Sequence, residues 1–122
     1  MEWLKKRIQS FAFAIRGILQ YLKSGVHPKI HLVATLIVII LGLYLELTSV
    51  EWCLVIMCIV GVWSTEAFNT AIELLADVVQ PEQDERIGKI KDISAAGVLF
   101  FAIGSLIIGG FVFLPKLIVL IK

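Results

Sequence analysis

The chain has 122 residues, of which 59% are hydrophobic, and its formal net charge is +1. A chain of this length holds one domain at most, and its hydrophobic content exceeds the roughly 45–50% of ordinary globular domains. With a mean hydropathy of +0.95, the composition argues against a soluble protein and predicts an all-α integral membrane protein.

Residues 1–24 predict an amphipathic surface helix. Its apolar side chains fall in an arc about 100° wide, with basic and amide side chains largely opposite. The apolar arc holds Leu4, Ile8, Phe11, Ile15, Ile18, Leu19 and Leu22. A basic face opposite an apolar stripe suits the cytoplasmic membrane surface. Both a plain membrane anchor and a lid over a site fit this pattern.

Three membrane spans are predicted after this helix, at 30–47, 51–79 and 92–114. The third is the clearest, because no charge interrupts the chain from Ile93 to Leu114 and this length crosses a hydrocarbon core of roughly 30 Å. Pro28 restrains the residue before it from helical dihedrals, so we expect the first span to begin near Ile30. The polar cluster after Pro81 predicts a loop at 80–91, and Asp92 is placed to cap the third span.

Basic residues are distributed unequally between the two sides of these spans. Nine of the eleven lie before the first span or between the second and third. The positive-inside rule therefore predicts that the N-terminus and the 80–91 loop are cytoplasmic and that the C-terminus lies outside. No cleavable signal is evident at the N-terminus.

Four polar side chains follow the apolar part of the second span, at Glu66, Asn69, Glu73 and Asp77. Their spacing of i, i+3, i+7 and i+11 gathers them on one helix face, within an arc about 80° wide. Like charges one turn apart repel, so a divalent cation or protons should neutralise part of this face. Magnesium, held by one or two carboxylates and substrate phosphates, fits well. A solvated face of a helix that emerges into the cytoplasm is the plainer alternative.

Lys91 and Asp92 should lie at the mouth of the third span, beside these carboxylates. Together these residues would supply what phosphoryl transfer needs: metal ligands, a cation for the phosphate and a candidate general base. The acceptor would be a lipid hydroxyl that enters laterally from the bilayer. Considered singly, Lys91 is explained as a positive-inside charge and Asp92 as a helix cap.

The polar run from Glu66 to Asp77, with Lys91-Asp92 and Ser94-Ala-Ala-Gly-Val-Leu after it, closely resembles the prokaryotic diacylglycerol kinase and undecaprenol kinase family. The resemblance covers nearly the whole chain, including the ending Phe113-Leu-Pro-Lys116. It implies a homotrimeric lipid kinase of the bacterial inner membrane, dependent on ATP and assisted by magnesium. Such an enzyme phosphorylates the primary hydroxyl of undecaprenol or diacylglycerol by direct in-line transfer. The resemblance implies no nucleic-acid partner.

The resemblance also implies roles for individual residues. Glu66 matches the proposed general base, and Glu73 matches a ligand of the ATP-associated magnesium. The other matched positions support the site or contact the nucleotide, and they are Asn69, Asp77, Glu82, Asp84, Lys91 and Asp92.

One position departs from the family pattern. Gly25 stands where the family usually carries a second metal-binding glutamate, so magnesium binding could be weaker. A catalytically impaired protein that binds lipid or nucleotide is therefore an alternative, and a small ion-conducting oligomer is a third. Both lipids offer a primary alcohol on a long apolar body. The Phe113–Lys116 ending and Ala95 resemble the undecaprenol-using branch.

Overall fold

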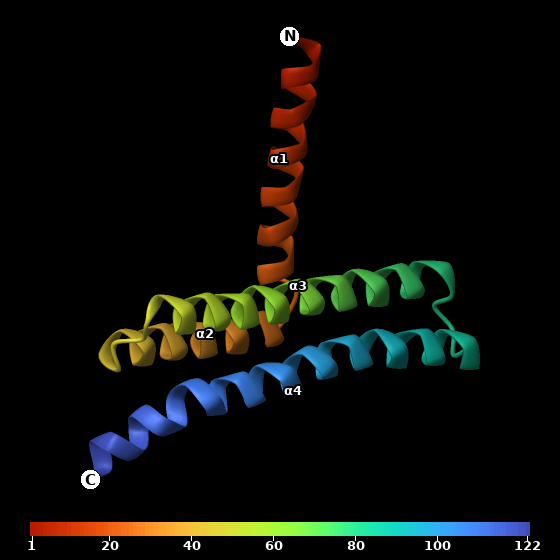
Figure 1. Ribbon diagram of the computed structural model, residues 1–122. Helices are drawn as coiled ribbons and strands as arrows, with labels where there is room; N and C mark the ends of the chain where they lie inside the picture. Colours follow the sequence, from red (N-terminus) through yellow and green to blue (C-terminus); the bar gives the residue numbers. More distant parts are fainter. The chain divides into compact units, whose positions relative to one another are not determined.

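A computed structural model describes residues 1–122 as four α-helices with no strand. They are α1 (Glu2–Leu22), α2 (His27–Tyr44), α3 (Ser49–Val79) and α4 (Glu85–Ile121), shown in Figure 1. The last three are long and apolar enough to cross a membrane. The predicted fold class, three spans with an additional amphipathic helix at the N-terminus, is confirmed.

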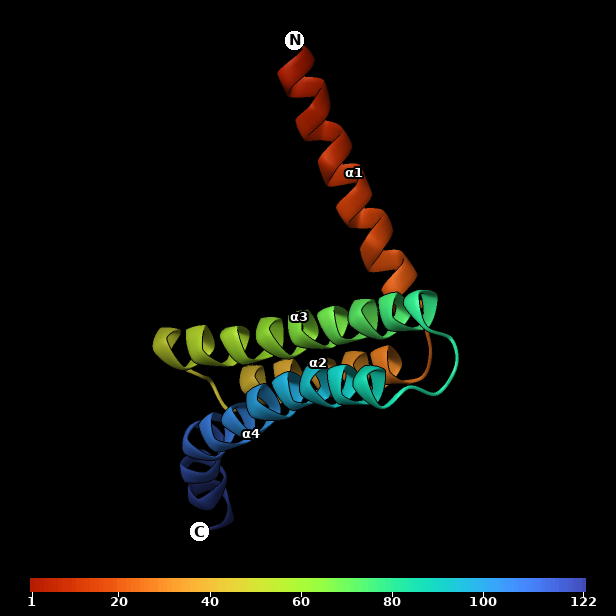
Figure 2. The same ribbon diagram turned by 90° about the vertical axis from the view of Figure 1, so that its right-hand side faces the viewer.

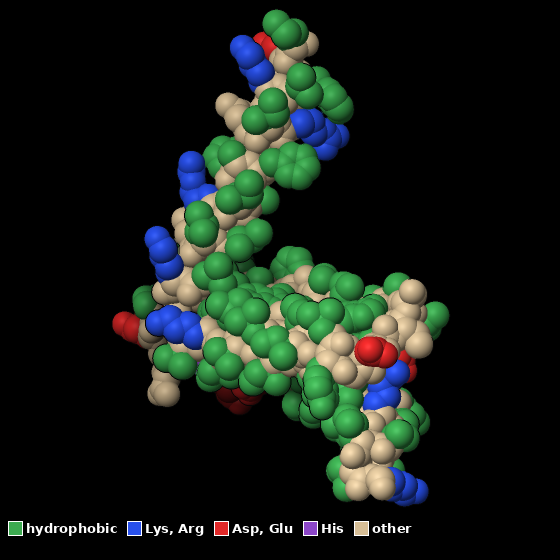
Figure 3. Space-filling view, turned by 90° about the vertical axis from the view of Figure 1, so that its left-hand side faces the viewer, with side chains coloured by type: hydrophobic (Ala, Val, Ile, Leu, Met, Phe, Trp, Pro, Cys, Tyr) green, Lys and Arg blue, Asp and Glu red, His purple; other side chains and the backbone are tan.

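The chain divides into two compact units, Met1–Ala34 and Thr35–Lys122. In the first unit, α1 buries none of its residues, and basic and hydrophobic side chains share its surface (Figure 3). Two of its arginines lie over aromatic rings, Arg7 at 5.3 Å from the centroid of Trp3 and Arg16 at 5.6 Å from that of Phe13. Such stacking holds the cation beside an apolar surface, as suits a helix at a membrane interface.

The second helix begins earlier than the proline suggested. The backbone N–H of Ile30 donates to the carbonyl of Val26, so the first turn includes His27 and Pro28. Proline is tolerated in a first turn because the N–H that it lacks would have no partner within the helix there. The prediction that His27 stays outside the helix is therefore wrong.

In the second unit, a tight connection joins α2 to α3. Glu46 adopts a left-handed backbone conformation with φ of 51°, and Leu47 turns into the core. Thr48 then caps α3: its hydroxyl accepts from the N–H of Glu51 at 3.3 Å, and the Glu51 carboxylate accepts from the N–H of Thr48 at 2.8 Å. This reciprocal capping box satisfies two backbone donors and fixes the start of α3.

Helices α3 and α4 lie side by side in both ribbon views (Figures 1 and 2). A small core forms from Leu47, Val55 and Val112, and most large hydrophobic side chains of the spans remain exposed. The space-filling view shows the resulting apolar surface in green (Figure 3). Such a surface suits contact with lipid or with further copies of the chain.

The fourth helix is longer than expected at both ends. It begins at Glu85, and its N-cap is Asp84, so the predicted cap at Asp92 is wrong. It also continues through Pro115, which cannot donate to the carbonyl of Phe111 and crowds it. Figure 2 shows the last part of α4, in dark blue, bending away from its earlier course, and a proline is the usual cause of such a bend.

Candidate functional site

The polar face predicted from the sequence lies on the second half of α3. This helix runs unbroken to Val79, so Glu66, Asn69, Glu73 and Asp77 keep their shared face. Glu66 and Asn69 are partly buried, whereas Glu73 and Asp77 are exposed. Depth in a membrane is judged from length instead: about 20 helical residues from the start of α3 cross a core of roughly 30 Å. The face therefore begins where the hydrocarbon ends.

Two side-chain donors each bind one carboxylate of the acidic face. The Asn69 side-chain amide donates to the Glu73 carboxylate at 3.2 Å, and the Lys91 ammonium donates to Oδ1 of Asp77 at 2.6 Å. Each carboxylate outside the apolar segment thus has its own donor, which relieves the repulsion between charges one turn apart. The sequence placed Lys91 near this face but did not identify Asp77 as its partner.

Helices α3 and α4 are joined by a short link, and its polar residues are organised by Asp84. The Asp84 carboxylate accepts from the backbone N–H of Arg86 at 2.8 Å and from its guanidinium at 2.9 and 3.2 Å. These hydrogen bonds lower the pKa of Asp84 to about 2. Arg86 was not singled out from the sequence, although an arginine two residues after a capping aspartate signals such a pair.

Two other predicted site residues make no contact of this kind. Glu82 is exposed in the link, and Asp92 is exposed in the second turn of α4. Asp92 follows Lys91 by one residue, so its side chain points about 100° away around the helix. The structure therefore joins Lys91 to the acidic face and leaves Asp92 beside it, open to solvent.

The donor set for a metal ion is small. No group of three or more histidine, cysteine, aspartate or glutamate side chains converges in the chain. The Asn69 amide nitrogen contacts Glu73, one turn further along α3, and Oδ1 of Asn69 is buried without a hydrogen-bond partner. One carboxylate and one amide oxygen fit magnesium, which typically keeps waters and phosphate oxygens as its other ligands.

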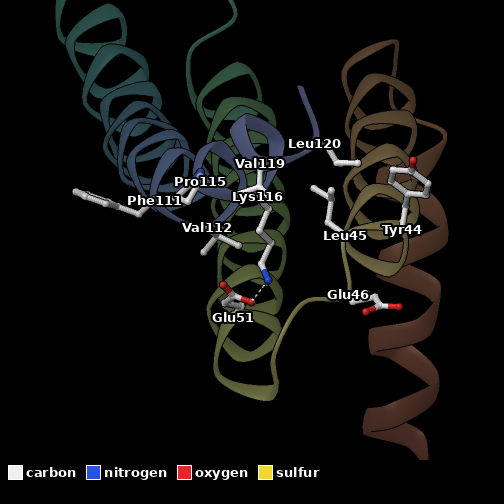
Figure 4. Close-up of a pocket in the computed structure, with 10 residues that line it drawn as sticks. All are labelled: Tyr44, Leu45, Glu46, Glu51, Phe111, Val112, Pro115, Lys116, Val119 and Leu120. Atoms are coloured by element: carbon white, nitrogen blue, oxygen red, sulfur yellow. Dashed lines mark ion pairs between the residues drawn. The ribbon is translucent and has the colours of Figure 1, made fainter. Parts of the chain in front are cut away.

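A groove of about 650 Å³ lies near the start of α3, between the last turns of α4 and the end of α2 (Figure 4). Its lining includes the ion pair between Lys116 and Glu51, with 3.2 Å between Nζ and Oε2. Glu51 and Asp77 are separated by about 40 Å along α3, so this groove is remote from the acidic face. We assign it no part in the chemistry.

The helices and the acidic face together define a class, a small membrane protein with three spans and a charged site at one membrane boundary. The model of the prokaryotic diacylglycerol kinase family matches residues 12–113. An undecaprenol kinase of Bacillus subtilis is 36% identical over 114 residues, which cover 93% of each chain. A diacylglycerol kinase of Synechocystis sp. is 31% identical over 112 residues, covering 89% of this chain and 63% of that protein. The chain belongs to the prokaryotic diacylglycerol kinase family.

Proposed function

We propose that this protein transfers the γ-phosphoryl group of ATP to the primary hydroxyl of a membrane lipid, undecaprenol or diacylglycerol. Membership of the family supports lipid kinase activity. The observation that carries the proposal is the Asp77–Lys91 pair: Asp77 shares its face with Glu66 and Glu73, and this face follows the apolar part of α3. A nucleotide from water and a hydroxyl from the bilayer can meet only at such a boundary.

Glu66 is the proposed general base. It is partly buried and is the residue of the acidic face that lies nearest the bilayer. A lipid hydroxyl that enters from the side therefore reaches Glu66 before it reaches Glu73 or Asp77. In the transfer step the lipid oxygen bonds to the γ-phosphorus, the bond from phosphorus to the ADP oxygen breaks, and the hydroxyl proton moves to the Glu66 carboxylate.

The remaining residues bind and orient the nucleotide. Glu73 and Asn69 would hold magnesium through their oxygens, and the ion, when bound, would neutralise phosphate charge. Lys91 would contact a phosphate oxygen through its ammonium group, with Asp77 beside it. Asp92, Glu82 and Asp84 lie near the nucleotide in this proposal, and Asp84 acts through the link that it caps. Positioning and electrostatics supply most of the catalysis.

We favour undecaprenol as the acceptor. The undecaprenol kinase of Bacillus subtilis supports this choice, because the match to it covers 93% of both chains at 36% identity. The chain also carries Ala95 and the ending Phe113–Lys116, which resemble the undecaprenol-using branch. Diacylglycerol remains the second candidate, since a relative of that name matches at 31% identity.

We further propose a homotrimer in the bacterial inner membrane, with the N-terminus and the link between α3 and α4 in the cytoplasm. The unequal distribution of basic residues supports this orientation. The exposed apolar side chains of the spans and the partly open acidic face support assembly with further copies. In an oligomer, neighbouring copies would cover what the three helices of one chain leave open.

Transfer of radiolabelled γ-phosphate tests the proposal, with undecaprenol and diacylglycerol offered separately in mixed micelles. The wild type should phosphorylate at least one lipid, and Glu66→Gln should abolish the transfer while nucleotide binding persists. Glu46→Gln, which removes a carboxylate near the start of α3, is the matched control and should retain activity. Normal turnover in Glu66→Gln would exclude Glu66 as the base. No transfer to either lipid by the wild type would favour a protein that binds without turnover. The glycine at position 25, in place of a metal-binding glutamate, suggests this alternative.

A further inference from the structure

We propose that Asp77 is a positioning residue that acts through Lys91: it holds the Lys91 ammonium in the nucleotide-free protein and competes with a nucleotide phosphate for it. The proposal rests on the function proposed above, and it assigns Asp77 an effect opposite to that of a nucleotide ligand. Asp77 then weakens nucleotide binding and fixes the position of the Lys91 ammonium before the nucleotide binds.

The pair forms because of how α3 and α4 are joined. Asp77 lies in the last turn of α3, which ends at Val79, and Lys91 lies in the second turn of α4, which begins at Glu85. The short link between these helices brings the two turns side by side. The long lysine side chain spans the remaining gap and reaches Oδ1 of Asp77 at 2.6 Å.

The pair holds Lys91 in place but does not enclose it. The Lys91 side chain is 36% exposed and that of Asp77 is 60% exposed, so water and a nucleotide can reach both. An ion pair this accessible is weak, because solvent screens it. A lysine contact with a phosphate that carries more charge than a carboxylate is stronger, so the exchange of Lys91 from Asp77 to the nucleotide is favourable and reversible.

The choice of partner also protects the candidate metal ligand. Glu73 lies one helical turn before Asp77 and is the nearest competing carboxylate on the same face. Glu73 accepts from the Asn69 amide, whereas the Lys91 ammonium donates to Asp77. Lys91 therefore lies beside the nucleotide site without neutralising Glu73, the carboxylate that would hold magnesium.

Asp77→Asn tests the proposal, because it keeps the shape of the side chain and removes its charge. Binding of a non-hydrolysable ATP analogue with Mg²⁺ is measured by calorimetry on the full chain in nanodiscs. We expect the dissociation constant to fall about fivefold, as loss of one screened charge near a phosphate implies. The KM for ATP should fall with it while kcat changes little. Asp77→Glu should restore the wild-type dissociation constant.

Two controls separate the role of Lys91 from a general charge effect. Glu85→Gln removes the same charge from the first turn of α4, away from the pair, and should leave the dissociation constant unchanged. In the Lys91→Gln background, Asp77→Asn should tighten binding by a smaller factor than in the wild type. An equal factor in both backgrounds would overturn the positioning role.

Weaker binding of the analogue by Asp77→Asn would also overturn the proposal and make Asp77 a direct support of the nucleotide, with the kinase proposal intact. If the wild type bound no analogue at all, both proposals would fall. Circular dichroism of each variant shows that the helices are retained, so a binding change reports on the site.

Discussion

The ring of Phe101 on α4 lies directly over Gly61 on α3. A Cβ atom at Gly61 would fall 1.9 Å from two ring carbons of Phe101, which is far inside van der Waals contact. The close approach of the two helices therefore depends on the absence of a side chain at this position. Small residues have this role in membrane helices, where packing rather than the hydrophobic effect holds neighbours together.

Gly61→Ala is expected to destabilise the protein by about 1–3 kcal/mol, because the added methyl group must displace the Phe101 ring or separate the helices. Unfolding in mixed micelles with increasing SDS measures the loss. Gly104→Ala is the matched control, since a Cβ there meets nothing within 4 Å, and it should leave stability unchanged. An equal effect of both changes would contradict the packing role of Gly61.

Thr35→Val should cost about 0.6 kcal/mol, the average for hydrogen bonds between membrane helices. The Thr35 hydroxyl accepts from the indole N–H of Trp63 at 2.9 Å, and valine has a similar shape but no acceptor. The same unfolding assay measures the effect. Adding Trp63→Phe to Thr35→Val should cost less than Trp63→Phe costs in the wild type, because the shared hydrogen bond is already lost. Strict additivity would show that this bond contributes nothing.

Gly25→Glu should lower the magnesium concentration needed for half-maximal kinase activity. It restores the carboxylate that the family usually carries at this position, and nothing lies within 4 Å of a Cβ placed there. Gly17→Glu, at a position that is equally open, adds the same charge on α1 and should not change the magnesium dependence. An unchanged dependence in Gly25→Glu would exclude a ligand role at this position.

The ion pair between Asp84 and Arg86 predicts that the stability difference between the wild type and Arg86→Gln depends on pH. The hydrogen bonds from Arg86 lower the pKa of Asp84 from 3.8 to about 2, so the folded state favours the ionised carboxylate. This stabilisation is fully present above pH 3.8 and is lost as the pH falls through 2. The melting temperature of the wild type should exceed that of Arg86→Gln near neutral pH, and the two should converge toward pH 2. A constant difference in melting temperature down to pH 2 would show that the Asp84–Arg86 pair does not stabilise the fold.

The sequence predicted three helices long and apolar enough to span a membrane, but not where those helices begin and end. Hydropathy shows where the uncharged segment begins, but not where the helix begins. Helix α4 starts before its uncharged segment, because its first turns carry Glu85, Arg86 and Lys89 and are solvated. Asp84 and Asp92 both have a side chain suited to capping. The structure uses Asp84, whose carboxylate also binds Arg86, and no periodic pattern distinguishes these two candidates.

The shared face of the four polar side chains on α3 was predictable, but the pairing of those side chains was not. Helical periodicity placed the four polar side chains on one face of α3, and the unbroken helix keeps them there. The partner of Lys91 depends on how far α4 is rotated and displaced against α3, which follows from contacts such as Phe101 on Gly61. No sequence spacing encodes that rotation, so Asp77 could not be selected over Glu73.

The ion pair between Glu51 and Lys116 has a mechanical consequence. It joins the start of α3 to the last turns of α4, and the same glutamate completes the capping box with Thr48. The two helices are thus fastened at the end remote from the acidic face and pressed together at Gly61. The short link after Val79 joins the same two helices at their other end, beside Asp77 and Lys91, so neither end of the α3–α4 pair is free to separate.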